Sequence, residues 1–260
     1  YRRYPDQFEV FKPCCKGSSP QQCPQQEVIN AYDNTILYTD HVLDRLISVL
    51  EARQKAEDSF LLYVSDHGES LTERDACYFS HDPFLYEETL RVPLVLRFPE
   101  GRYAGTVVDS LARGIDVLPT LCQIAGLAPA GGDQGTSLIG RIEGRDPAEY
   151  WLYAQTQTHD AKERSERVED AWLEHRVAFS DGRHKLILDL ETGRCSYFDL
   201  EADPGELDDK IDDPAAALEV ERLQRELRGL QERLPQAGSA TEELDPETLD
   251  ALRGMGYVGE

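Results

Sequence analysis

Hydrophobic and polar positions in the first half of the chain follow two patterns. Residues 26–56 carry apolar side chains at spacings of three and four, which predicts one amphipathic helix. The runs 60–64 and 92–98 are short, continuous and apolar, as is typical of strands in a parallel sheet covered on both faces. The segment "IDVLPTLCQIAGLAP" predicts another helix, with Asp116 near its start and Gly126 at its end. The order helix, strand, loop, strand, helix predicts a doubly wound α/β fold.

The pattern changes after about residue 150. Short alternating runs at 150–154, 176–180, 184–190 and 195–200 are punctuated by "SDGR" and "ETGR", which predicts hairpins of a small antiparallel sheet. Residues 214–234 carry leucines at helical spacing but too few heptads for a coiled coil, so we expect a helix packed on that sheet. The predicted division is 1–150 for the α/β domain, 151–234 for the sheet with its helix, and 235–260 for an acidic linker and short terminal helix.

Charge and composition exclude several classes of function. Among 260 residues, 50 acidic side chains outnumber 27 Lys and Arg, and the net charge of −23 repels nucleic acid and anionic lipid surfaces. No run approaches the roughly 20 apolar residues of a membrane helix, and no signal segment is recognisable. Because the chain begins at Tyr1 rather than at Met, we expect a piece of a longer protein.

Three of the six cysteines gather in one loop, "FKPCCKGSSPQQC", at Cys14, Cys15 and Cys23. We expect a disulfide there rather than a zinc site, since the loop offers no CxxC pair and no nearby histidine. A disulfide would imply an oxidising compartment.

Two acids and an imidazole follow the first predicted strand, in Asp66, His67, Gly68 and Glu69. In open parallel sheets, ligands bind beyond the carboxyl ends of the strands. Adjacent oxygen and nitrogen donors suit a divalent cation, and Gly68 allows the sharp turn that presents both. The alternative is that Asp66 caps a turn and His67 is a surface imidazole. On these four residues alone we favour the surface turn, and the residues that follow change this interpretation.

A third polar group, His81, follows Asp66 by fifteen residues, in a loop that leads through Tyr86 and Glu87 into the next predicted strand. From here the chain resembles the alkaline phosphatase superfamily, in its sulfatase and phosphoethanolamine transferase branches. The resemblance rests on an ordered series over nearly all of residues 1–211: "AYDNTILYTDHVLDRLI", "YVSDHGESL", the later His, "LYEETLRVPLVLRFPEG", "IDVLPTLCQIAGL" and "YFDLEADPGE".

Different segments of the chain resemble different branches of the superfamily. "YRRYPDQFEVFKPCC" and "CPQQEVINAYDNTILYTD" are similar to bacterial lipid A phosphoethanolamine transferases, which have a cysteine pair spaced as Cys15 and Cys23 are. The resemblance therefore implies a Cys15–Cys23 disulfide. "LYEETLRVPLVLRFP", "FDLEADPGE" and "LDPETLDALRGMGYVG" look like the sulfatase branch. The chain departs from the family in "TERDAC", where a Gly-rich segment is usual, and at Asp82, where Gly commonly follows the later His.

The resemblance also implies roles for individual residues. Asp66 and His67 would be metal ligands, with zinc the first expectation and Mn or Ca as alternatives. His81 would bind an oxygen of the transferred phosphoryl or sulfuryl group. Glu69 would either orient a ligand or remain a solvated carboxylate. The family nucleophile is a Thr, or a Cys or Ser in a C/S-x-P-x-R motif. This chain lacks that motif, so we expect the nucleophile in a missing N-terminal half.

The sequence thus predicts metal-dependent transfer of phosphoethanolamine to a cell-envelope glycolipid such as lipid A. The substrate would be an anionic phosphoryl or sulfuryl ester, and the location periplasmic or otherwise extracytoplasmic. The alternatives are a sulfuric ester hydrolase and a non-catalytic extracytoplasmic domain. The remaining histidines, His41, His159, His175 and His184, are expected to have surface or packing roles.

Overall fold

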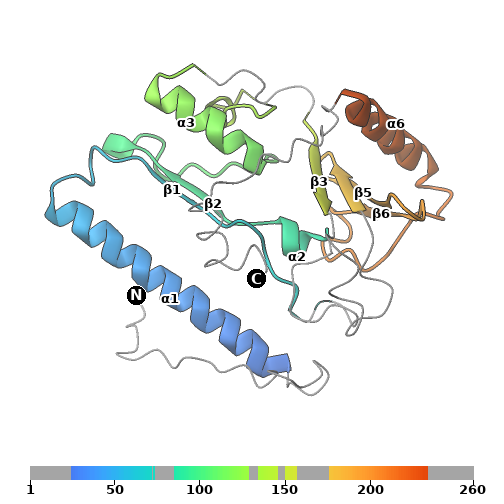
Figure 1. Cartoon of the computed structure of the whole chain (residues 1–260), viewed down its shortest axis with the longest axis horizontal. Coiled ribbons are helices and arrows are strands. Elements are labelled where there is room, and N and C mark those ends of the chain that lie inside the picture. Colours follow the sequence, from blue (N-terminus) through green and yellow to red (C-terminus); the bar gives the residue numbers. More distant parts are fainter. Residues whose placement is uncertain are drawn as a thin grey trace, which may run out of the picture. The chain divides into compact units, whose positions relative to one another are not determined.

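The computed structural model describes residues 25–71, 73, 85–128, 134–145, 150–156 and 176–233. Its helices and strands are, in chain order, α1 (Gln25–Ala52), β1 (Leu61–Val64), α2 (Glu87–Leu90), β2 (Leu94–Arg97), the short 3-10 helices η2 (Pro99–Gly101) and η3 (Gly114–Asp116), α3 (Val117–Ala125), α4 (Ile139–Ile142), β3 (Leu152–Thr156), β4 (Arg176–Ser180), β5 (His184–Asp189), β6 (Cys195–Asp199) and α6 (Ala217–Arg233) (Figure 1). Contacts group the chain into two compact units, residues 1–223 and 224–260. The predicted segment 235–260 lies outside the described residues.

The helices predicted at 26–56, in the segment "IDVLPTLCQIAGLAP" and at 214–234 are confirmed as α1, α3 and α6. α1 spans Gln25–Ala52, and its Leu43, Ile47 and Leu50 are half-buried. α3 ends at Gly126, whose φ of 68° is the left-handed conformation that glycine adopts without steric cost. Among the described residues, no helix combines the length and the apolar character needed to cross a membrane.

Strands β1 and β2 form a two-stranded sheet, and their relative direction corrects the sequence prediction. They pair antiparallel, with Leu61 opposite Arg97 and Val64 opposite Leu94. Val64 and Val95 are 39% and 58% exposed, so these strands are not covered on both faces as expected. A run of apolar residues reports burial and not direction, whereas parallel neighbours need a long crossover. In the described part of the connection, the helix α2 has only four residues.

The second sheet agrees with the predicted hairpins. Its four strands follow the order β3-β4-β5-β6, and every neighbouring pair is antiparallel. The "SDGR" and "ETGR" turns join β4 to β5 and β5 to β6. Their glycines, Gly182 and Gly193, have φ of 93° and 71°, which explains why the turns use glycine.

A small hydrophobic core joins α2 to this sheet. Leu85, which precedes α2, is buried together with Ala178, Ile187 and Phe198 of β4, β5 and β6. Tyr86 adds an edge-to-face contact to Phe198, with ring centroids 6.1 Å apart. The segment that leads into β2 is therefore anchored on the four-stranded sheet.

Candidate functional site

The turn after β1 is fixed by its own hydrogen bonds. The Ser65 hydroxyl donates to the His67 carbonyl oxygen at 2.9 Å, and the His67 amide donates to Asp66 Oδ1 at 3.0 Å. Oδ1 is thus engaged by the backbone, while Oδ2 lies 3.7 Å from His67 Nε2. The carboxylate and the imidazole therefore face each other at the end of the strand.

The hydrogen bond of His67 Nδ1 decides which ring nitrogen carries the lone pair. Nδ1 lies 2.9 Å from the Gly68 carbonyl oxygen. A carbonyl oxygen only accepts, so Nδ1 is the protonated donor and Nε2 of the neutral ring carries the lone pair. Nε2 is also the atom that faces Asp66. A backbone carbonyl that orients the ring in this way is the usual support of a metal-binding histidine.

The donor set fits a divalent cation. A zinc ion bound about 2.0–2.2 Å from each of two donors keeps those donors within about 4 Å of each other. The observed 3.7 Å between Asp66 Oδ2 and His67 Nε2 meets this condition. The side chains of Asp66 and His67 are 60% and 35% exposed, so the pair is open to an ion and to further ligands. Within the described residues, no group of three or more His, Cys, Asp or Glu side chains is arranged to hold a metal.

Gly68 packs the turn against the end of α2. Its amide donates to the Thr89 carbonyl oxygen at 2.8 Å. A Cβ atom on Gly68 would lie 2.1 Å from the Glu88 carbonyl oxygen, so a side chain has no room there. The sequence explained Gly68 by backbone freedom, and the structure adds this close approach as the reason for glycine.

Of the other predicted site residues, Glu69 lies among the described residues, and His81, Cys15 and Cys23 do not. Glu69 Oε1 lies 3.9 Å from His67 Nδ1, whereas the Gly68 carbonyl oxygen lies 2.9 Å from the same nitrogen, within hydrogen-bond distance. His81, Cys15 and Cys23 lie outside the described residues, so their roles stay predictions.

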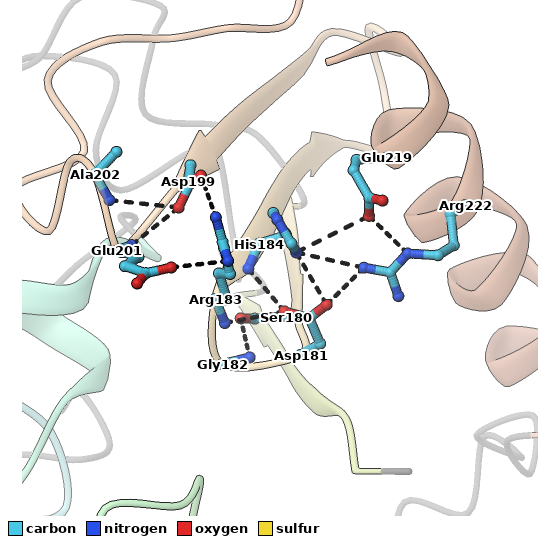
Figure 2. Close-up of polar contacts among 10 residues, drawn as sticks. All are labelled: Ser180, Asp181, Gly182, Arg183, His184, Asp199, Glu201, Ala202, Glu219 and Arg222. Atoms are coloured by element: carbon cyan, nitrogen blue, oxygen red, sulfur yellow. Dashed lines mark hydrogen bonds and ion pairs between the residues drawn. The ribbon is translucent and has the colours of Figure 1, made fainter. Parts of the chain in front are cut away.

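A second polar network surrounds His184, for which the sequence favoured a structural role. Figure 2 shows His184 and Arg222 directed at Asp181, in the turn between β4 and β5. Arg222 Nη2 lies 2.5 Å from Asp181 Oδ2, and Arg222 Nε donates to Glu219 at 2.7 Å. Burial raises the pKa of Asp181, but hydrogen bonds from the His184 amide, the Arg222 guanidinium and the Arg183 amide outweigh it and hold this pKa at about 2. The network ties the turn to α6 and accounts for His184 structurally.

Lys185 belongs to a polar cluster that was not predicted from the sequence. Its side chain is fully buried in β5, and its Nζ contacts the carboxylates of both Glu87 and Glu206. A signal was present, because a lysine in the buried strand sequence "HKLILD" needs a carboxylate partner. The sequence does not say which of the many acidic residues provides it.

Comparison with known proteins connects this geometry to a family. A family model described as "Sulfatase" matches residues 1–127, and a model described as "N-sulphoglucosamine sulphohydrolase, C-terminal" matches residues 76–233. The second match alone covers more than half of the chain. The chain belongs to the sulfatase-like family. The family match agrees with the predicted α/β fold of the sulfatase and alkaline phosphatase type, and the observed elements confirm the small antiparallel sheet and the C-terminal helix.

Individual relatives of this sulfatase-like chain fall in both predicted branches. Phosphoethanolamine transferase EptA of Salmonella typhimurium is 48% identical over 73 residues, which cover 28% of this chain and 13% of the transferase. N-acetylglucosamine-6-O-sulfatase of Bacteroides thetaiotaomicron is 27% identical over 208 residues, which cover 76% of this chain and 35% of the sulfatase. The chain thus spans well under half the length of either relative.

A solved structure agrees on the fold of the sulfatase-like chain. A protein determined in complex with its substrate D-glucosamine-2-N,6-O-disulfate superposes with a TM-score of 0.69 and 24% identity, covering 80% of this chain and 41% of that protein.

Proposed function

We propose that this chain provides Asp66 and His67 as ligands of a divalent cation in an enzyme that transfers phosphoethanolamine to a cell-envelope glycolipid such as lipid A. Zinc is the cation we expect, because the pair combines an imidazole with a carboxylate, whereas Mg²⁺ prefers oxygen ligands. The observation that carries the proposal is the 3.7 Å approach of His67 Nε2 to Asp66 Oδ2 in a turn that fixes both side chains.

Asp66, His67 and His81 have distinct roles in this proposal. Asp66 would offset part of the charge of the cation through its carboxylate, whose Oδ1 accepts the His67 amide proton and whose Oδ2 lies 3.7 Å from His67 Nε2. His67 presents Nε2 because its Nδ1 is held by Gly68. His81 would donate a hydrogen bond to a peripheral oxygen of the transferred group, where negative charge develops. The cation, when bound, supplies charge stabilisation and lowers the pKa of the attacking oxygen.

We propose that the nucleophile comes from outside this chain. The chain has no C/S-x-P-x-R motif, and its relatives contain long portions to which it does not align. The complete enzyme would act in the periplasm or another extracytoplasmic space, where a glycolipid headgroup and an oxidising environment are both available.

The choice of transfer over hydrolysis rests on the higher local identity. The 48% match to a phosphoethanolamine transferase exceeds the 27% match to a sulfatase. Hydrolysis of a sulfuric ester is the second candidate, and the extent of similarity favours it. The sulfatase aligns over 76% of this chain, and the second family model takes its description from a sulphohydrolase.

A direct assay separates the candidates. The complete enzyme carrying this chain, loaded with zinc, is given phosphatidylethanolamine with lipid A in one reaction and N-acetylglucosamine-6-sulfate in another. We expect lipid A to gain the mass of phosphoethanolamine, with no sulfate released. Sulfate release without lipid modification would replace the proposal by the hydrolase. Failure of both reactions in folded, metal-loaded enzyme would support a non-catalytic domain.

A further inference from the structure

Lys185 is a charged residue buried inside the protein, where a charge is unfavourable. Its side chain is 0% exposed, and it lies in β5 between His184 and the buried Leu186. An isolated ammonium group in such surroundings is strongly destabilising, so its charge has to be balanced by close partners. Lys185 has no direct role in the proposed metal binding or group transfer.

Two carboxylates from distant parts of the chain meet Lys185. Its Nζ lies 2.9 Å from Glu87 Oε1 and 2.8 Å from Glu206 Oε1. Glu206 is also fully buried, and burial raises its pKa above the ordinary value despite the opposing effects of Lys185 and the Glu87 amide. Glu206 further has a φ of 52°, a left-handed conformation that is strained for a residue other than glycine. The backbone of the "DPGE" loop thus adopts a strained form that places this carboxylate inside.

Glu206 also caps α2. The Tyr86 side chain, at the N-cap position of α2, makes no capping hydrogen bond. Instead, Glu206 Oε2 accepts the Glu87 amide proton at 2.6 Å, across 119 positions of sequence. A carboxylate at a helix N-terminus binds an amide that otherwise lacks a partner and interacts favourably with the helix dipole. Lys185, Glu87 and Glu206 together, here called the ion triad, therefore fix the start of α2.

The other end of α2 holds the candidate site. Thr89 accepts the Gly68 amide proton, and the Glu88 carbonyl fills the space where a Gly68 side chain would lie. The Gly68 carbonyl in turn orients the His67 ring. A continuous series of contacts therefore runs from the ion triad through α2 and Gly68 to the pair formed by Asp66 and His67.

We propose that Lys185, Glu206 and Glu87 are positioning residues for the metal-binding turn. The ion triad, supplied largely by the four-stranded sheet and the loop after it, fixes α2, and α2 fixes the turn that presents Asp66 and His67. This inference rests on the proposed function only in calling the turn a metal site. The mechanical connection itself does not depend on any metal.

Three substitutions in the complete enzyme test the connection: Glu87→Gln, Glu206→Gln and Lys185→Met. Lys210→Met and Glu201→Gln are matched controls, because they change ion pairs on the exposed surface of the same region. Glu87→Gln changes the partly exposed member of the ion triad, whose side chain is 26% exposed, and leaves the buried Lys185 paired with Glu206. We therefore expect folded protein from Glu87→Gln even where Lys185→Met does not fold. The measurements are hydrogen exchange in the peptide covering 63–71, zinc affinity by titration, and turnover.

We expect faster exchange at 63–71 in the metal-free protein, with protection retained in β4–β6. Zinc affinity and kcat should fall about 10- to 100-fold, as for other residues that support metal ligands. KM should change by no more than about threefold, because the substitutions act on the turn that presents Asp66 and His67 and not on a residue proposed to bind substrate. The controls should match wild type.

Unchanged exchange and zinc affinity in folded Glu87→Gln would overturn the inference. Failure of the proposed function has a different signature, since Asp66→Asn would then leave zinc affinity unchanged. Exchange at 63–71 would still decide whether the ion triad holds the turn.

Discussion

Gly68 has no room for a side chain. In Gly68→Ala, the new Cβ would meet the Glu88 carbonyl oxygen at 2.1 Å, so the turn or α2 must move and the hydrogen bond to Thr89 must lengthen. We expect a loss of about 1–3 kcal/mol in the free energy of unfolding, as for other insertions into packed sites. Denaturant unfolding measures it. Gly114→Ala is the control, since nothing lies within 4 Å of its Cβ position. Equal stability of the two variants would contradict the close approach.

Asp181 predicts a defined pH dependence. Its pKa is lowered from 3.8 to about 2 in the folded chain. A depressed carboxyl pKa contributes stability that is complete above the unfolded pKa of 3.8 and is lost as pH falls toward 2. Asp181→Asn should therefore unfold more easily than wild type by about 2 kcal/mol at pH 7, with the gap closing below about pH 4.

Unfolding curves of wild type and Asp181→Asn between pH 3 and pH 7 measure that gap. Asp208→Asn removes an exposed carboxylate of an ion pair with Lys210 and should cost no more than about 0.5 kcal/mol at any pH. A gap for Asp181→Asn that stays constant across the range would assign its effect to shape and not to charge.

The short helix α2 is held by packing more than by its own helical tendency. Four residues form at most one turn, which is unstable alone. Leu85 supplies much of the packing, being 5% exposed among Ala178, Ile187 and Phe198. Leu85→Ala should cost about 2–4 kcal/mol in the free energy of unfolding. Leu207→Ala, at a position 72% exposed, should change it by less than about 0.5 kcal/mol, and similar losses in both would contradict this core.

Helices and hairpins were predictable from the sequence where a local pattern of residues determines them. Helical spacing located α1, Gly126 located the end of α3, and the "SDGR" and "ETGR" turns located the hairpins of the second sheet. The relative direction of β1 and β2 was predicted wrongly, because these strands have the apolar content of parallel strands but pair antiparallel. The ion triad was not predicted either. Glu87 is 98 positions from Lys185 and 119 positions from Glu206 along the chain, and periodicity carries no information on such pairs.

The candidate site was predictable in part for a similar reason. Asp66, His67 and Gly68 are adjacent, so a local pattern could indicate a metal-binding turn. The orientation of the His67 ring by the Gly68 carbonyl is a contact between neighbours, but it depends on a local backbone conformation that residue types do not report. The support of Gly68 by α2 is a tertiary contact, and only the structure gives it.

For the molecule as a whole, the state of its cysteines reports the compartment in which it folds. We expect Cys15 and Cys23 to form a disulfide, which for so short a loop stabilises by about 2–3 kcal/mol at most. Thiol counting under denaturing, non-reducing conditions should find four free thiols among six cysteines in protein from an oxidising compartment. Six free thiols would contradict the disulfide that the resemblance to the transferases implies.

Metal content measured beside turnover tests the central claim most directly. Asp66→Asn and His67→Ala, made in the complete enzyme, should lose zinc and activity together, because each removes a ligand of the same ion. His81→Ala should retain zinc and lose turnover, with the barrier raised by about 2–4 kcal/mol, because it removes one charge-stabilising contact. Asp208→Asn should retain both. Full zinc content and near-normal turnover in the Asp66, His67 and His81 variants alike would mean that the "SDHGE" segment is a turn with a surface histidine, and the proposed metal site would be wrong.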